Sequence, residues 1–189
     1  NDIIYLLYEV LNMDFNDLIL KRRSVRSFIK KEIPDNIIFD AINDSVNCPS
    51  WKNSQVSRFY LISSIEAINK IQNALPEFNQ ESSLNAKLVI TTYVNNRSGF
   101  SKETGLAESE LGNGFGLYDL GLNNAYFVLA LKNRGLDSLI MGIRNEELLR
   151  NICNIPSTET IVSVIAVGYS DLVPLRPKKK NANEITKII

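Results

Sequence analysis

The chain has 189 residues, of which 44% are hydrophobic and 22% are charged, values typical of one soluble globular domain. Lysine and arginine together number 21, and so do aspartate and glutamate, so the chain lacks the global positive field that attracts nucleic acid or a membrane. We therefore expect neither a nucleic-acid partner nor a membrane partner, and any basic patch must be local.

The absence of histidine and the positions of the two cysteines exclude several kinds of catalytic site. The chain contains no histidine, which excludes histidine-based triads, histidine metal sites and imidazole general bases. Cys48 and Cys153 form no CxxC motif, so neither a metal site nor a dithiol redox site is expected. Their separation favours buried thiols in a reducing cytoplasm over a disulfide. If the protein is an enzyme, a cofactor is expected to supply its chemistry.

We expect neither a signal peptide nor a membrane-spanning helix in this sequence. Acidic Asp2 stands where a signal peptide has cations, and no apolar run reaches the ~18 residues of a spanning helix. Met13 can serve as a natural initiator, which would make residues 1–12 an N-terminal extension. We expect a cytoplasmic protein in which residues 13–189 form a single domain.

The first predicted element is a helix over about residues 14–22, capped by Asp14. A strongly basic stretch, residues 21–28, follows it and suits neither a helix nor a strand. One interpretation is a solvated basic turn. The other is an anion pocket, because arginine offers a planar fork of donors and serine a hydroxyl that can bond a phosphate oxygen.

A second helix begins at Ile33-Pro34-Asp35, with proline near the first turn where its missing N–H costs nothing. Its amphipathic pattern continues to about Asn47. The polar loop 49–55 then leads into a short apolar strand at residues 59–62.

A third helix is predicted from the capping-box spacing of Ser63 and Glu66, and Pro76 is expected to close it. The β-branched run 87–94 predicts the next strand. Residues 95–113 form a long loop without periodicity, which is typical of a functional lid or of disorder.

The longest predicted helix, about residues 114–134, is apolar nearly all round and therefore belongs in a large core or an oligomer interface. We assign Asp119, Gly121 and Asn124, which interrupt it, to packing within a dimer. Gly135 ends the helix as the glycine after its C-cap.

A strand over residues 136–142 runs into a glycine that lets the main chain approach a ligand, or simply makes a turn. A helix capped by Asn145 and a strand over residues 160–169 follow. The basic tail that begins at Pro174 is either a solvated linker or a phosphate grip. In an extended chain Lys178 and Lys180 would point the same way.

The order of these motifs resembles one known family. Arg-Arg-Ser-x-Arg at residues 22–26, then a helix, then Pro-Ser-x-x-Asn-Ser-Gln entering a strand, is similar to the nitroreductase family of FMN-dependent NAD(P)H oxidoreductases. The resemblance extends over about residues 13–189. It departs at Val56 and Ser57, where the family commonly has Pro-Trp, which puts the local packing in doubt more than the cofactor.

The resemblance implies an α+β fold with a central, mainly antiparallel sheet surrounded by helices, in a domain-swapped homodimer with two FMN sites. Residues 22–26 would hold the flavin phosphate and ring edge, the loop 49–55 would come from the partner subunit, and residues 170–189 would form an arm across that partner. The cofactor-binding residues implied are Arg22, Arg23, Ser24, Arg26, Pro49, Ser50, Trp51, Asn53, Gln55, Asn79, Ile140, Met141, Gly142, Lys178 and Lys180.

The resemblance also implies an activity. Hydride from NADH or NADPH would pass through FMN to a nitroaromatic, a quinone or a similar small acceptor by a ping-pong mechanism, with no catalytic residue beyond the flavin itself. Arg22 would stabilise negative charge on the ring. The alternatives are a flavin protein of the same fold that performs dehalogenation or flavin breakdown, and a non-enzymatic flavin-binding or nucleic-acid-binding protein.

Overall fold

The structure is a computed structural model that describes residues 14–189. The predicted extension over residues 1–12 and the candidate initiator Met13 lie outside the described residues. Among the described residues, no helix combines the length and the apolar character needed to cross a bilayer.

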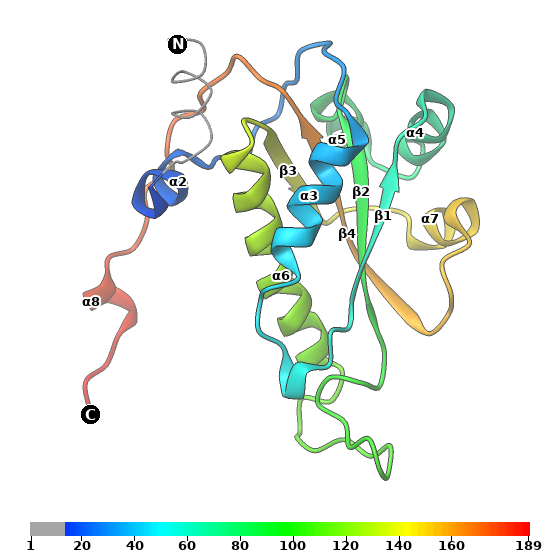
Figure 1. Ribbon diagram of the computed structural model, residues 1–189, viewed down its shortest axis with the longest axis vertical. Coiled ribbons are helices and arrows are strands. Elements are labelled where there is room, and N and C mark those ends of the chain that lie inside the picture. Colours follow the sequence, from blue (N-terminus) through cyan, green and yellow to red (C-terminus); the bar gives the residue numbers. More distant parts are fainter. Residues whose placement is uncertain (1–13) are drawn as a thin grey trace.

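A four-stranded sheet forms the centre of the molecule (Figure 1). In chain order the elements are α2 (Phe15–Lys21), α3 (Asp35–Ser45), the 3-10 turn η1 (Trp51–Asn53), β1 (Ser57–Ile62), α4 (Ile65–Gln72), α5 (Glu77–Ser82), β2 (Lys87–Val94), α6 (Gly114–Asn133), β3 (Asp137–Met141), α7 (Glu146–Cys153), β4 (Glu159–Gly168) and α8 (Ala182–Ile185). The strand order is β1-β2-β4-β3, and every neighbouring pair is antiparallel. The predicted α+β class and antiparallel sheet are confirmed.

The two faces of the sheet bury different sets of side chains because successive residues of a strand point to opposite sides. On β2, Leu88 and Ile90 join one core cluster, with Ile71 of α4 and Leu149 of α7. Val89 joins the other cluster, which is covered by α3 and α6. Figure 1 shows α3 and α6 side by side over one face, with α4 and α7 beyond the other.

Helix α6 is the longest element of the described chain, and its main-chain ends agree with the prediction. It begins at Gly114, and its C-cap, Arg134, is followed by Gly135 with φ +76°. That left-handed conformation favours glycine and ends the helix cleanly. Near the other end, a Cβ on Gly116 would collide with the Tyr93 ring, so glycine there allows the helix to lie close on the sheet.

Two predicted helix boundaries between residues 63 and 82 are wrong. The N-cap of α4 is Ser64, whose hydroxyl accepts from the Ala67 N–H, because the Ser63 hydroxyl is already bonded to Asp35. Pro76 does not close α4, which ends at Gln72. It is instead the N-cap of the short helix α5, which the sequence pattern did not predict. Asp14 does stand at the N-cap of α2, but its side chain makes no capping hydrogen bond.

Candidate functional site

The basic stretch that follows α2 meets the tail of the chain. A cavity of about 360 Å³ lies between residues 22–26 and residues 174–179. Its lining includes five cationic side chains, which are Arg22, Arg23, Arg26, Arg176 and Lys179. The two segments are far apart in sequence, so the fold itself creates this concentration of positive charge.

The charge of this basic pocket is not neutralised within residues 14–189. No carboxylate lines it, and none of its five cations takes part in the ion pairs of the described chain. Like charges gathered in one cavity repel each other, and an anion relieves that repulsion. The geometry therefore favours the anion-pocket interpretation over a solvated turn, with a phosphate as the ligand that best matches arginine and serine donors.

Arg23 connects the basic pocket to the end of α2. Its Nη1 donates to the carbonyl of Arg22 at 2.8 Å and to that of Leu20, so it closes the end of α2. Its Nε is buried and has no partner among the described residues. One donor of this guanidinium thus remains unsatisfied at the edge of the pocket.

The outer edge of the sheet lies beside the basic stretch. Ser24 forms a parallel bridge with Ser138, and the Val25 N–H donates to the Ser138 carbonyl at 3.1 Å. Beyond that bridge, no strand of the described chain pairs with the outer edge of β3, where Ile140 is 48% exposed. Added to Gly142, a Cβ would meet nothing within 4 Å. The strand edge at Ile140 is thus open to a ligand, and so is the space around Gly142, although the Gly142 carbonyl already accepts from Arg144 Nη1 at 2.8 Å.

Asn79, another of the predicted cofactor-binding residues, contacts the main chain just after this strand. It sits in α5 with 7% of its surface exposed, and its Nδ2 donates to the Ile143 carbonyl at 3.3 Å. The contact fixes the main chain just after Gly142. The structure therefore brings Asn79 together with Ile140, Met141 and Gly142, although Met141 itself is buried in the core.

In the tail, the structure places different basic residues at the pocket from those we expected. Lys178 and Lys180 are not among its lining residues, whereas Arg176 and Lys179 are. The expectation assumed strand-like alternation, but residues 170–180 have no regular secondary structure. No strand ladder therefore imposes alternation on these side chains.

The second predicted group, in the loop 49–55, lies at the other end of α6. The loop forms a tight turn in which Lys52, Asn53 and Gln55 have φ of 44°, 53° and 49°. For residues other than glycine such left-handed conformations cost about 1–3 kcal/mol each and persist only where surrounding contacts impose them.

Asp119 supplies those contacts. Its carboxylate accepts from the Trp51 N–H at 3.0 Å, from Ser54 Oγ at 3.2 Å and from Ser98 Oγ. Asn124 is likewise used within the chain, donating to Thr91 Oγ1 at 3.3 Å. Our assignment of Asp119 and Asn124 to dimer packing is therefore wrong, since both are buried against their own chain. Gly121 is exposed, so its proposed role at an interface stays a prediction.

The loop 95–113 is ordered by contacts with the same turn. Besides the Ser98 bond to Asp119, Lys52 forms an ion pair with Glu108 at 2.7 Å. A bridge between Phe100 and Ala107 closes the loop on itself. Trp51 packs on Phe115, with ring centroids 4.3 Å apart. The 95–113 loop and the 49–55 turn are thus packed together at the start of α6.

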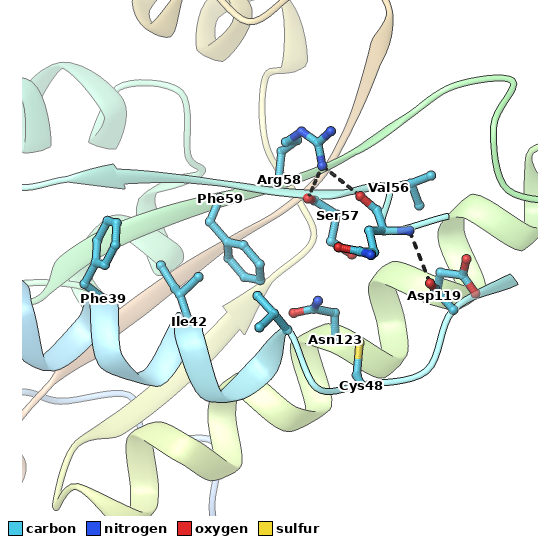
Figure 2. Close-up of a pocket in the computed structure, with 12 residues that line it drawn as sticks. Phe39, Ile42, Cys48, Val56, Ser57, Arg58, Phe59, Asp119 and Asn123 are labelled. Atoms are coloured by element: carbon cyan, nitrogen blue, oxygen red, sulfur yellow. Dashed lines mark hydrogen bonds between the residues drawn. The ribbon is translucent and has the colours of Figure 1, made fainter. Parts of the chain in front are cut away.

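Figure 2 shows a neighbouring cavity of about 300 Å³ between α3, β1 and the first half of α6. Phe39, Ile42 and Phe59 make one side of it apolar, and Arg58 donates to the carbonyl of Gln55 at 2.9 Å. Burial raises the pKa of the Cys48 thiol, so it stays protonated and unreactive at neutral pH.

Burial likewise raises the pKa of Cys153. In residues 14–189, no group of three or more cysteine or carboxylate side chains is placed to hold a metal ion. The described chain therefore offers an anion pocket and an open strand edge, and neither an activated thiol nor a metal cluster.

The two groups of predicted residues do not meet within one chain. Asp119 holds the 49–55 turn near the start of α6, whereas Arg134 leads into β3 beside the basic stretch, and the helix rises about 22 Å between these residues. Figure 1 shows α2 near the C-terminal half of α6 and the cyan turn that follows α3 at its other end.

The family model described as "Nitroreductase family" matches residues 19–169. A search of curated proteins gives no match.

Three solved structures share the fold of this chain. A candidate nitroreductase from Exiguobacterium sibiricum in complex with FMN is 16% identical, with TM-score 0.81, covering 94% of this chain and 98% of its own. A candidate NAD(P)H:FMN oxidoreductase from Staphylococcus epidermidis is 17% identical, with TM-score 0.80, covering 94% and 97%. CLA-ER, an enone reductase of a gut-bacterial fatty acid saturation metabolism, is 19% identical, with TM-score 0.81, covering 95% and 99%. At these identities the likeness concerns the fold.

Proposed function

Since the chain belongs to the nitroreductase family, we propose that it is an FMN-dependent oxidoreductase that transfers hydride from NADH or NADPH to a small organic acceptor. The observation that carries this proposal is the basic pocket free of carboxylates beside the open edge of β3. The relatives named for FMN, or holding it, support the same cofactor.

The residues of the pocket fit a flavin mononucleotide. Its terminal phosphate carries close to two negative charges, which Arg26, Arg176 and Lys179 can balance, while Ser24 supplies a hydroxyl. The unpartnered Nε of Arg23 is a further donor. The open strand edge at Ile140 and the unobstructed approach to Gly142 would offer main-chain hydrogen bonds to the polar edge of the ring.

When bound, FMN supplies the redox chemistry, taking hydride from the nicotinamide and passing it to the acceptor. The protein binds and orients the reactants, and Arg22 contributes positive charge at the ring edge. Because one face serves both reactants in turn, we expect ping-pong kinetics. Candidate acceptors are nitroaromatics and quinones, and the similarity to an enone reductase adds activated alkenes.

A second copy of the chain completes the site in this proposal. The 49–55 turn lies at the opposite end of α6 from the basic pocket, so a copy related by a twofold axis can bring its turn to the first copy's pocket. Trp51, Asn53 and Gln55 would then line the flavin from the second chain, with Pro49 and Ser50 in the same turn. The tail 170–189 would lie across that chain.

The test has two parts, done on the purified full chain. The cofactor released by denaturation is identified by mass, and FMN is expected, whereas FAD or no flavin would contradict the proposal. Anaerobic rapid mixing then follows the flavin band, which NADH or NADPH should bleach and a quinone or nitroaromatic should restore in a separate step. An FMN-loaded protein that no nicotinamide reduces would rule out the oxidoreductase.

A further inference from the structure

Asp119 is an unusual group for the interior of this protein. Only 3% of its surface is exposed, yet no cation pairs with it within residues 14–189. A buried charge is costly unless hydrogen bonds replace its water. Asp119 has such bonds, because a main-chain N–H and two hydroxyls donate to it from two different loops.

The turn that Asp119 anchors is strained and outward-facing at once. Three of its residues are left-handed, and Ser50 Oγ accepts from the Gln55 N–H at 3.2 Å to close it. The side-chain amides of Asn53 and Gln55 are exposed and make no hydrogen bond within residues 14–189. Strain of this kind is typical of segments that present groups to a ligand in a fixed geometry.

The same carboxylate also fixes the neighbouring loop. Ser98, at the start of the 95–113 loop, donates to it, and Lys52 of the turn pairs with Glu108 of that loop. Trp51, whose main chain is bonded to Asp119, stacks its ring on Phe115 of α6. One buried anion thus sets the position of both segments on α6.

We propose that Asp119 is a positioning residue that holds the 49–55 turn preorganised for the flavin bound by a second chain, so that the turn's exposed amides need no ordering when FMN binds. This inference rests on the proposed function. Preorganisation increases affinity because the ordering cost is met during folding and not on binding.

The experiment compares the wild type with Asp119→Asn, which keeps the shape of the side chain but removes its charge. Trp51 is the only tryptophan of the chain, so its fluorescence reports on the turn alone. In the apo dimer we expect Asp119→Asn to raise the acrylamide quenching of Trp51. We also expect it to raise the FMN dissociation constant by about tenfold or more.

Two further variants keep the test decisive. Glu159→Gln is the matched control, because Glu159 is a second buried carboxylate, 8% exposed and bonded by Tyr60 and Thr92 away from the turn. It should lower the melting temperature without changing Trp51 quenching or FMN affinity. Ser54→Ala removes one donor to Asp119 and should raise Trp51 quenching and the FMN dissociation constant by a smaller amount. If Asp119→Asn fails to fold, Ser54→Ala alone tests the proposal.

The outcomes separate this inference from the proposed function. If wild type and Glu159→Gln bind FMN while Asp119→Asn and Ser54→Ala bind it equally well with unchanged quenching, the positioning role is overturned and the oxidoreductase stands. If Glu159→Gln weakens FMN binding as much as Asp119→Asn does, the effect is general destabilisation and the inference also fails. If wild type binds no FMN, the proposed function is wrong, and the inference that rests on it is wrong as well.

Discussion

At the scale of single residues, the positive charge of the basic pocket comes from the two segments that the sequence indicated, but the predicted Lys178 and Lys180 do not line it. Arg22, Ser24 and Arg26 stand out because they place planar guanidinium donors and a hydroxyl within five residues. The tail offers four cationic candidates within residues 176–180, and nothing local decides which of them face the pocket.

Substitutions in the tail test that assignment. Arg176→Ala removes a cation that lines the pocket, so we expect FMN to bind about tenfold more weakly. Lys178→Ala removes a neighbouring cation that does not line it and should change the dissociation constant less than threefold, or about 0.6 kcal/mol. Flavin fluorescence titration measures both. Equal losses in the two variants would show that the tail acts only through its overall charge.

Tyr60 gives a prediction for the dependence of stability on pH. Burial, together with a hydrogen bond to the Glu159 carboxylate, raises the pKa of its hydroxyl from 10.0 to about 12. A raised pKa means that the folded state favours the protonated phenol. The resulting stabilisation is complete below pH 10 and is lost as the pH rises toward 12.

Urea unfolding of wild type and Tyr60→Phe between about pH 9 and pH 11.5 checks this. The free energy of unfolding of wild type should fall more steeply with pH than that of Tyr60→Phe, because lysines and other tyrosines titrate equally in both. Parallel pH profiles would exclude a perturbed hydroxyl at this position.

At the scale of elements, local signals predicted most helices and strands well. Strand β2 has the predicted bounds, and Asn145 caps α7 by accepting from the Leu148 N–H. The helix α5 was missed because six residues hold too little periodicity. The cap of α4 was placed one residue early because Ser63 bonds to Asp35, which is distant in sequence.

The register of β4 shows why the core could not be predicted fully. Its pairing with β2 shifts between Thr91 and Thr92, so one extra residue is inserted into the ladder. Because of this extra residue, Ile161 and Val164 face the same side of the sheet although they are three positions apart. Both lie in the same core cluster. A strictly alternating pattern would have placed these two side chains on opposite faces.

The end of α6 offers a test at this scale. Gly135→Ala puts a side chain at a left-handed position, where φ is +76°, but where nothing lies within 4 Å of the new Cβ. The cost is therefore the backbone strain alone, about 1 kcal/mol of unfolding free energy. Gly142→Ala is the control, since it has equal space and no positive φ, and its stability should stay within about 0.5 kcal/mol of wild type. Equal stabilities of the two variants would contradict the assigned C-cap.

At the scale of the whole molecule, one chain exposes more large apolar side chains than a stable monomer needs. Phe15 of α2 is 66% exposed, Leu117 and Tyr118 of α6 are 50% and 62% exposed, and Ile188 of the tail is almost fully exposed. Exposed apolar surface of this extent is typical of an association surface. The sequence indicated the same through the uniformly apolar helix.

We therefore predict a dimer without a stable monomer. Light scattering of the full chain should give about twice the 21.3 kDa mass of one chain, and dilution should cause dissociation and unfolding together. A monodisperse species of one-chain mass that retains its flavin would contradict the two-chain site.

The sequence indicated candidate site residues, but not the contacts within the chain that hold them in place. The basic stretch and the 49–55 turn are both recognisable motifs, yet the structure separates them by most of the length of α6. Asp119, which organises the turn, lies 68 residues from Trp51 in sequence, and only the folded chain joins them.

Mixed dimers test the central claim, a flavin site built from two chains. One chain carries Arg26→Ala, its partner carries Asn53→Ala with Gln55→Ala, and the two are co-expressed with different affinity tags. In the mixed dimer, one site combines the Arg26→Ala pocket of one chain with the substituted turn of the other. The second site combines an unaltered pocket with an unaltered turn. We predict one FMN bound with wild-type affinity per mixed dimer, against weak binding in both parent homodimers. A mixed dimer whose two sites are both weak would show that each site lies within a single chain and would contradict the account.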